Sequence, residues 1–184
     1  MGRLLVWDLV SLDGYFEGPN SDLSFMQYAW GPELEGFINA QASDFGTIVF
    51  GRRTYEGMAT YWRDKTDYIG KVMNSTPKVV FSDTLPRAEW KNSRVAKGDL
   101  RAEVDRIKRE TSKDAFVLGS ANLVARLAQE NLVDEYRIGV VSLVLGKGTH
   151  LFRDVTKSIP LRLVEARQLG HKIVLLRYLP TPTK

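Results

Sequence analysis

The 184-residue sequence contains no cysteine. Disulfide bonds, thiolate zinc sites and a cysteine nucleophile are therefore all excluded. Because nothing marks an oxidising compartment, we expect the protein to be cytoplasmic. The sequence opens with Met1-Gly2-Arg3 and an apolar run broken by Asp8. This run is too short to span a membrane and lacks the pattern of a signal peptide, so we expect no membrane partner.

Runs of one charge sign are also missing. Lysine and arginine number 26 against 22 acidic residues, which gives a net charge of +4, and they are scattered along the chain. This balance does not favour a nucleic-acid partner. With 43% hydrophobic and 26% charged residues, the composition is that of an ordinary globular protein. The length predicts a single domain over residues 1–184.

Histidine is scarce, and the familiar nucleotide motifs are absent. The two histidines, His150 and His171, stand apart without acidic or hydroxyl partners at a telling spacing, so neither a hydrolytic triad nor a metal site is expected. The sequence has no three-glycine dinucleotide fingerprint and no Walker-type glycine-lysine-serine motif. A doubly wound dinucleotide fold and a phosphate-binding loop are therefore both disfavoured.

Two segments nevertheless combine a strand, a glycine turn and a helix. In the first, the apolar strand 115–118 ends at the turn Gly119-Ser120. A helix of about ten residues follows, with Ala121 and Asn122 in its first turn, and a return strand begins at Asp134. A glycine at such a turn lets another molecule approach the backbone, and free amides at a helix start suit a phosphate. Such turns are also common as simple connections.

In the second segment, strand 47–50 ends at Gly51, and a helix is predicted over 55–61. Between them, the forked donors of Arg52 and Arg53 suit a phosphomonoester, and Thr54 adds a hydroxyl. The alternative is that both arginines are solvated surface residues.

The other segments predict an α/β fold. Residues 3–12 form a strand that is buried on both faces, residues 13–31 form a long loop, and a helix begins at Pro32. Strand 78–82 ends at Ser82, which would lie near the second glycine turn in a parallel sheet. A helix capped by Asp99 and an antiparallel hairpin of strands 161–169 and 172–179 complete the prediction. We therefore expect a mixed, mostly parallel sheet with helices on both faces.

Three carboxylates are candidates for proton transfer or for orienting a ligand. Asp8 lies in an apolar strand, where it is either a hydrogen-bonding anchor or a polar group in a pocket. Asp13 precedes Gly14 and is also a typical turn former. Glu35 lies on the rim of the apolar face of the helix that begins at Pro32, where it either looks into a cleft or is simply exposed.

The chain resembles the dihydrofolate reductase-like superfamily, and more closely the reductase domain of riboflavin biosynthesis (RibD C-terminal domain-like). The matching segments keep the family order and span nearly the whole chain. They are Ser11-Leu12-Asp13-Gly14, Gly51-Arg52-Arg53-Thr54-Tyr55-Glu56, Lys78-Val79-Val80-Phe81-Ser82, Leu118-Gly119-Ser120, Leu132-Val133-Asp134-Glu135 and Leu145-Gly146-Lys147-Gly148-Thr149-His150-Leu151-Phe152.

This resemblance implies a three-layer fold with about eight strands, and NADPH across the carboxyl ends of the strands. By family position, Arg52, Arg53 and Thr54 would hold the 2′-phosphate and pyrophosphate, with Ser82 on the adenine side. Residues 119–122 would hold the pyrophosphate at a helix start. Glu35 falls about where dihydrofolate reductases place the carboxylate that binds the pterin. The resemblance also implies a homodimer.

The function implied is NADPH-dependent hydride transfer to a pteridine-like or aminopyrimidine-like heterocycle, as in 5-amino-6-(5-phosphoribosylamino)uracil reductase. Two departures bear on it. Gly119-Ser120 replaces the usual Gly-Gly turn, and Tyr15-Phe16-Glu17 replaces the small or basic residues that contact a substrate phosphate. A non-catalytic nucleotide-binding module, a dihydrofolate reductase proper and a flavin enzyme stay open as alternatives.

Overall fold

The computed structural model describes residues 1–111 and 113–181. Its strands in chain order are β1 (Leu4–Ser11), β2 (Tyr15–Glu17), β3 (Phe45–Gly51), β4 (Lys78–Phe81), β5 (Ser93–Ala96), β6 (Asp114–Val117), β7 (Glu135–Val141), β8 (Thr149–His150), β9 (Leu161–Leu169) and β10 (Ile173–Pro180). Its helices are the short 3-10 helix η1 (Pro19–Ser21), α1 (Phe25–Ala29), α2 (Pro32–Ala42), α3 (Arg52–Trp62), α4 (Tyr68–Ser75), α5 (Leu100–Glu110) and α6 (Ala121–Gln129).

Eight of the strands form one mixed sheet in the order β5-β4-β3-β6-β1-β7-β10-β9. The strand pairs from β5 through β7 are all parallel, whereas β10 pairs antiparallel with both β7 and β9. The predicted mostly parallel sheet and its C-terminal antiparallel hairpin are therefore confirmed. The remaining strands, β2 and β8, pair with each other in a separate ribbon.

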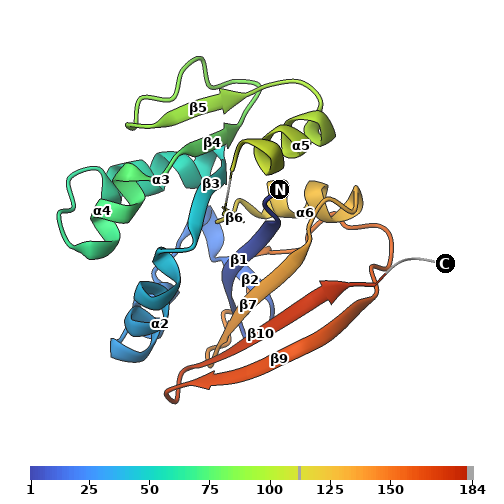
Figure 1. The fold of residues 1–184 in the computed structure, drawn as a ribbon. Helices are drawn as coiled ribbons and strands as arrows, with labels where there is room; N and C mark the ends of the chain where they lie inside the picture. Colours follow the sequence, from blue (N-terminus) through green and yellow to red (C-terminus); the bar gives the residue numbers. More distant parts are fainter. Residues whose placement is uncertain (112, 182–184) are drawn as a thin grey trace.

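Helices cover both faces of the sheet, as predicted (Figure 1). Helices α5 and α6 pack on one face, where Val104 and Leu127 join the buried side chains of β1 and β6. Helices α1 to α4 lie on the other face, over two further apolar clusters. Ile38 of α2 packs against both of those clusters and so links α2 to the helices beside it.

The chain forms these elements for simple physical reasons. The first three residues of β1 are fully buried, as a strand covered on both faces requires. At α5, the Asp99 carboxylate accepts the Ala102 amide at 2.7 Å, which satisfies one of the free amides at the helix start. Leu100, Val104 and Ile107 then bury one stripe of that helix.

The structure differs from the sequence-based prediction in three places. Residues 13–31, expected as a loop, contain β2, η1 and the short helix α1. The edge strand β5 was not predicted, because it is only partly buried and carries the charged Arg94. The two-residue strand β8 exists only as the partner of β2. None of the helices among residues 1–111 and 113–181 is long and apolar enough to cross a membrane.

Candidate functional site

The two glycine turns predicted from the sequence meet at the carboxyl ends of β3 and β6. The amide of Gly51 donates to the carbonyl oxygen of Gly119 at 3.1 Å. A Cβ atom on Gly51 would overlap the hydroxyl of Ser120 and lie 3.2 Å from its amide nitrogen, so only glycine fits this approach without displacement. From here α3 leads away to β4, and α6 leads in the other direction to β7. Ligands of open α/β sheets bind at such switch points.

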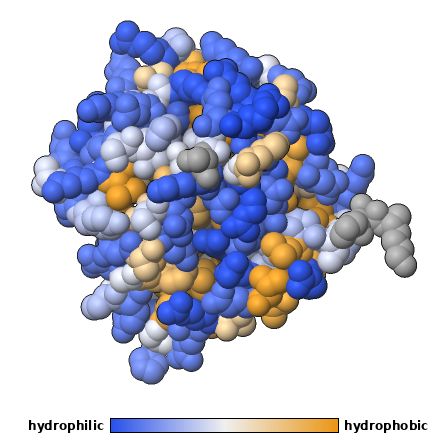
Figure 2. Space-filling view, viewed as in Figure 1, coloured by the Kyte–Doolittle hydropathy of each residue, from blue (hydrophilic) through white to orange (hydrophobic). Residues whose placement is uncertain are grey.

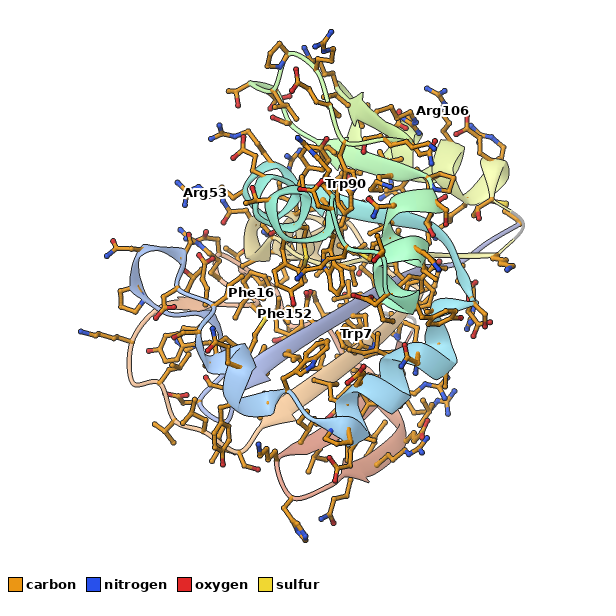
Figure 3. The ribbon with its side chains drawn as sticks, turned by 90° about the vertical axis from the view of Figure 1, so that its left-hand side faces the viewer. Trp7, Phe16, Arg53, Trp90, Arg106 and Phe152 are labelled. Carbon is orange, nitrogen blue, oxygen red and sulfur yellow. The ribbon has the colours of Figure 1, made fainter. Side chains whose placement is uncertain are left out.

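Both helices that start at this junction have free amides. Gly51 at the start of α3 and Ser120 at the start of α6 make no side-chain cap. The unpaired amides carry partial positive charge and suit an anion. Arg52 and Arg53 are exposed at the first of these starts, and Arg53 points outward from α3 (Figure 3). Asn122 is exposed in the first turn of α6.

Thr54 and Ser82 lie at the same edge. An added Cβ on Gly119 would lie 3.1 Å from Thr54 Oγ1, so this hydroxyl faces the Gly119 turn. Phe81 pairs with Gly51, which places Ser82 beside the start of α3. The Ser82 hydroxyl already accepts the amides of Thr84 and Leu85, at 3.2 and 2.9 Å. It therefore also holds the loop that follows β4.

Phe16 covers the Gly119 turn. Its ring would lie 2.6 Å from a Cβ on Gly119, and its side chain is only 4% exposed. Figure 3 shows Phe16 inside the molecule. From the sequence, Phe16 is one of several aromatic residues around the first strand and loop that could form an apolar wall for a flat heterocycle. Its contact with the Gly119 turn was not predicted.

Asp13 joins two loops. Its Oδ1 accepts from the Ser11 hydroxyl at 2.6 Å and from the Leu145 amide at 3.0 Å, and its Oδ2 accepts from the Gly146 amide at 2.7 Å. The Ser11 hydrogen bond, with help from the backbone amides, lowers the pKa of Asp13 to about 2. An ionised carboxylate with both oxygens engaged anchors the loop after β7. This geometry does not supply a proton donor, so the predicted catalytic role of Asp13 stays a prediction.

Glu35 lies in the first turn of α2 and is exposed. Helix α2 precedes the parallel strand β3 and runs back across the sheet, so its first turn lies toward the carboxyl ends of the parallel strands. Glu35 is free to approach a ligand there. Its predicted catalytic role also stays a prediction.

Asp8 is buried beside the Gly119 turn. It is 5% exposed, its carboxyl group faces the Gly119 amide, and Oδ2 has no hydrogen-bond partner among the described residues. Burial raises its pKa well above the ordinary value, although the Gly119 amide opposes this shift. The sequence left open whether Asp8 is an anchor or a group in a pocket. In the structure Asp8 is buried against the Gly119 turn, as an anchor would be, and its Oδ2 has no hydrogen-bond partner among the described residues.

Two cavities lie away from these turns. One, of about 570 Å³, lies at the amino ends of β3, β4 and β5, and the other, of about 580 Å³, lies beside Trp90. Neither is lined by Gly51, Gly119 or Phe16. Among residues 1–111 and 113–181, no three histidine, aspartate or glutamate side chains lie where they could share a metal ion.

Comparison with known proteins supports this reading of the fold. An uncharacterised protein of Bacillus subtilis (strain 168), YyaP, is 30% identical over 183 residues, which cover 96% of this chain and 94% of YyaP. The crystal structure of a putative riboflavin biosynthesis protein from Shewanella sp. PV-4 has a TM-score of 0.80 at 20% identity and covers 98% of this chain and 99% of its own.

Dihydrofolate reductase from Enterococcus faecalis, solved with NADP(H), has a TM-score of 0.67 at 13% identity, with 98% of each chain covered. The fold is therefore dihydrofolate reductase-like. Residues 5–175 match the family model described as the RibD C-terminal domain. Because this match covers most of the sequence, the chain belongs to the RibD C-terminal domain family.

Proposed function

We propose that the protein is an NADPH-dependent reductase that transfers hydride to a flat nitrogen heterocycle of the pteridine or aminopyrimidine type. The observation that supports this most is the junction of two uncapped helix starts, joined by the bond between Gly51 and Gly119. Such a pair suits a diphosphate, and the exposed Arg52 and Arg53 beside it suit the additional 2′-phosphate of NADPH.

The residues present fit the cofactor. The amides at the starts of α3 and α6 would hold the pyrophosphate, and Thr54 would add a hydroxyl. The nicotinamide supplies the hydride. The protein binds the cofactor and the substrate, orients them toward each other and excludes water. For the pyrophosphate to approach Gly119, the side chain of Phe16 must move, because it covers that glycine.

The negative charge of the segment between Arg3 and Arg52, which we propose to contact the substrate, favours a heterocycle without a phosphate group. Between Arg3 and Arg52 the sequence has seven acidic residues and no lysine, arginine or histidine. This segment builds β1, β2, α1, α2 and β3, and the first turn of α2 carries Glu33 and Glu35. Carboxylates repel a phosphate at a helix start that would otherwise attract it. The substrate is therefore proposed to differ from phosphoribosylaminouracil, with Glu35 available to orient it.

The arginines provide the first test. Arg52→Ala and Arg53→Ala are each expected to weaken NADPH binding about tenfold, because each removes a charge-assisted contact to the 2′-phosphate. NADH lacks this phosphate, so its affinity should change little. Titration of both cofactors, followed by the fluorescence of the four tryptophans, measures the difference. An equal loss for NADPH and NADH would contradict the assignment.

A second measurement separates an enzyme from a non-catalytic nucleotide-binding module of the same fold. The oxidation of NADPH is measured by its loss of absorbance in the presence of each of a panel of pterins and aminouracils, with and without a phosphate group. Turnover of an unphosphorylated heterocycle supports the proposal. Binding of NADPH without any turnover supports the binding module instead.

We also propose that two copies of the chain pair through the β9–β10 hairpin. This hairpin forms one edge of the sheet and exposes Leu163 by 51%, Val174 by 41% and Val164 by 38%. Figure 2 shows apolar side chains gathered at the lower right, over the region of this hairpin. An exposed apolar edge of this length favours pairing with another copy.

Leu163→Glu is expected to convert the dimer to a monomer, because it places a charge in an apolar interface. Size-exclusion chromatography with light scattering gives the mass directly. A matched control is Leu12→Glu, since Leu12 is also exposed, by 65%, but lies in the turn that follows β1. A wild-type protein that is monomeric at micromolar concentration contradicts the proposal.

A further inference from the structure

Asp8 stands where two central strands separate. Strand β1 pairs with β6 only as far as Val6 and Val117, although it continues beside β7 as far as Ser11 and Val141. Asp8 is the second residue beyond the last β1–β6 pair. It therefore lies opposite Gly119, which is two residues beyond Val117 in the turn that follows β6, and its carboxyl group is close enough for the Gly119 amide to stabilise the charged form. Asp8 therefore supports one of the two glycine turns from beneath.

The surroundings of Asp8 contain no charge to balance a carboxylate. On its face of β1 the neighbours are Val6 and Val10, and on β7 they are Ile138 and Val140. Gly119, Ala121 and Phe16 belong to the turn, helix and ribbon around it, and burial raises the pKa of Tyr136, the titratable side chain of β7 on this face, above its ordinary value, so that its hydroxyl is neutral. Among the described residues, only burial and the Gly119 amide shift the pKa of Asp8.

The second oxygen of Asp8 also favours the uncharged form of this carboxyl group. Oδ2 is buried and has no hydrogen-bond partner among the described residues. An ionised oxygen in that position would leave a buried charge unsatisfied, which is far more costly than a neutral hydroxyl. The fold therefore favours the uncharged carboxylic acid.

We propose that Asp8 is a positioning residue for the dinucleotide: it supports the Gly119 turn from beneath, and this turn binds an anionic dinucleotide more tightly while the carboxyl group is uncharged. The inference rests on the proposed function, since it assumes that the turn holds the pyrophosphate. A carboxylate directly beneath that site would repel the phosphates through an apolar interior, where charges are weakly screened. Dinucleotide binding and protonation of Asp8 therefore favour each other.

The sign of the pH dependence follows from this coupling. Raising the pH ionises Asp8 and weakens NADPH binding, and binding near the folded-state pKa takes up a proton. The dissociation constant of the wild type is expected to rise about tenfold or more between about pH 5 and about pH 9, since a shift of one pKa unit on binding corresponds to a tenfold change. The comparison is clearest above about pH 7, where ionisation of the 2′-phosphate is essentially complete.

The test compares the wild type with Asp8→Asn. Asparagine has the same shape, keeps an oxygen for the Gly119 amide and cannot ionise. The variant is expected to bind NADPH as tightly as the wild type at about pH 5 and to lose much less affinity at high pH. A purely structural role would give the variant a loss of affinity at every pH.

Two further measurements test the protonation of Asp8 directly. Calorimetry of the wild type in two buffers of different ionisation enthalpy is expected to show proton uptake on NADPH binding. In urea titrations at neutral pH, Asp8→Asn should be more stable than the wild type. An acid whose folded-state pKa is raised contributes stability at low pH that is lost as the pH rises, and asparagine avoids this loss.

Equal pH dependence in both proteins, or no proton uptake, would overturn the role of Asp8 and leave the reductase proposal intact. If the wild type binds NADPH at no pH, both proposals are overturned.

Discussion

Glu135→Ala is expected to lower the free energy of unfolding by about 3–5 kcal/mol, since it breaks a buried ion-pair network on one side. Glu135 is the first residue of β7 and is only 1% exposed. Its Oε1 accepts from Arg137 at 2.7 Å and from Arg177 at 2.8 Å, and its Oε2 pairs with Arg3 at 3.0 Å. One carboxylate thus pairs with three arginines.

The loss is large because one of these arginines has no other anionic partner among the described residues. Arg3 keeps Asp114, and Arg177 keeps Glu165. Arg137 keeps a neutral hydrogen bond to Gln41, at 3.0 Å, and its place over the Phe116 ring, but no other ion pair among the described residues, and its side chain is 11% exposed. Alanine at position 135 therefore leaves a largely buried guanidinium without a counter-charge.

Equilibrium unfolding in urea measures this effect, and Glu165→Ala is the matched control. Glu165 is 34% exposed and pairs with Arg177 alone, so its loss should cost about 0–1 kcal/mol. Burial tends to raise the pKa of Glu135, but the hydrogen bonds from Arg177 and Arg137 outweigh it and hold the pKa below the ordinary 4.5. The contribution of Glu135 is therefore present at neutral pH and lost as the pH falls through the folded-state value. Equal losses in both variants would show that the network is not cooperative.

Gly51→Ala is expected to weaken NADPH binding by roughly ten- to a hundredfold, the equivalent of about 1–3 kcal/mol of overpacking. The backbone of Gly51 has φ −78° and ψ 159°, which alanine adopts without strain. The effect comes from the methyl group, which would overlap the Ser120 hydroxyl and lie 3.1 Å from the Ser120 Cβ. It therefore pushes apart the two helix starts that are proposed to hold the pyrophosphate.

Gly57→Ala in the same helix is the matched control. No atom lies within 4 Å of a Cβ built on Gly57, so the substitution causes no clash. It should leave NADPH binding unchanged and stabilise α3 by about 1 kcal/mol, because alanine is the better helix former. Fluorescence titration of both variants, with thermal unfolding to verify their folding, decides the outcome. Wild-type affinity in a folded Gly51→Ala protein would mean that the junction does not bind the cofactor.

Much of the fold was predictable because central strands of a parallel sheet are buried on both faces. Apart from Asp8, β1 reads as an apolar run as far as Val10 for this reason, and residues 48–50 of β3 and 115–117 of β6 are likewise apolar. Strand β5 escaped prediction, since an edge strand has no such signature. Helix α1 was missed because five residues are too few to show a helical period.

The candidate site was predictable only in its parts. The glycines, Arg52 and Arg53 stand out in the sequence because their chemistry suits a phosphate at a helix start. No local sequence pattern predicts that Phe16 covers Gly119 or that Asp8 faces the amide of Gly119. Those contacts join segments that are distant along the chain.

The sequence by itself therefore determined the strand and helix types, the two glycine turns and the family resemblance, since each depends on residues close together in the chain. Only the tertiary structure decided that β3 lies next to β6, which brings Gly51 to Gly119. It also decided that Asp13 anchors a loop with both oxygens and that Asp8 is buried with one oxygen free. The physical reason is that the pairing of distant strands, and the burial of a charged group, are properties of the packed sheet as a whole.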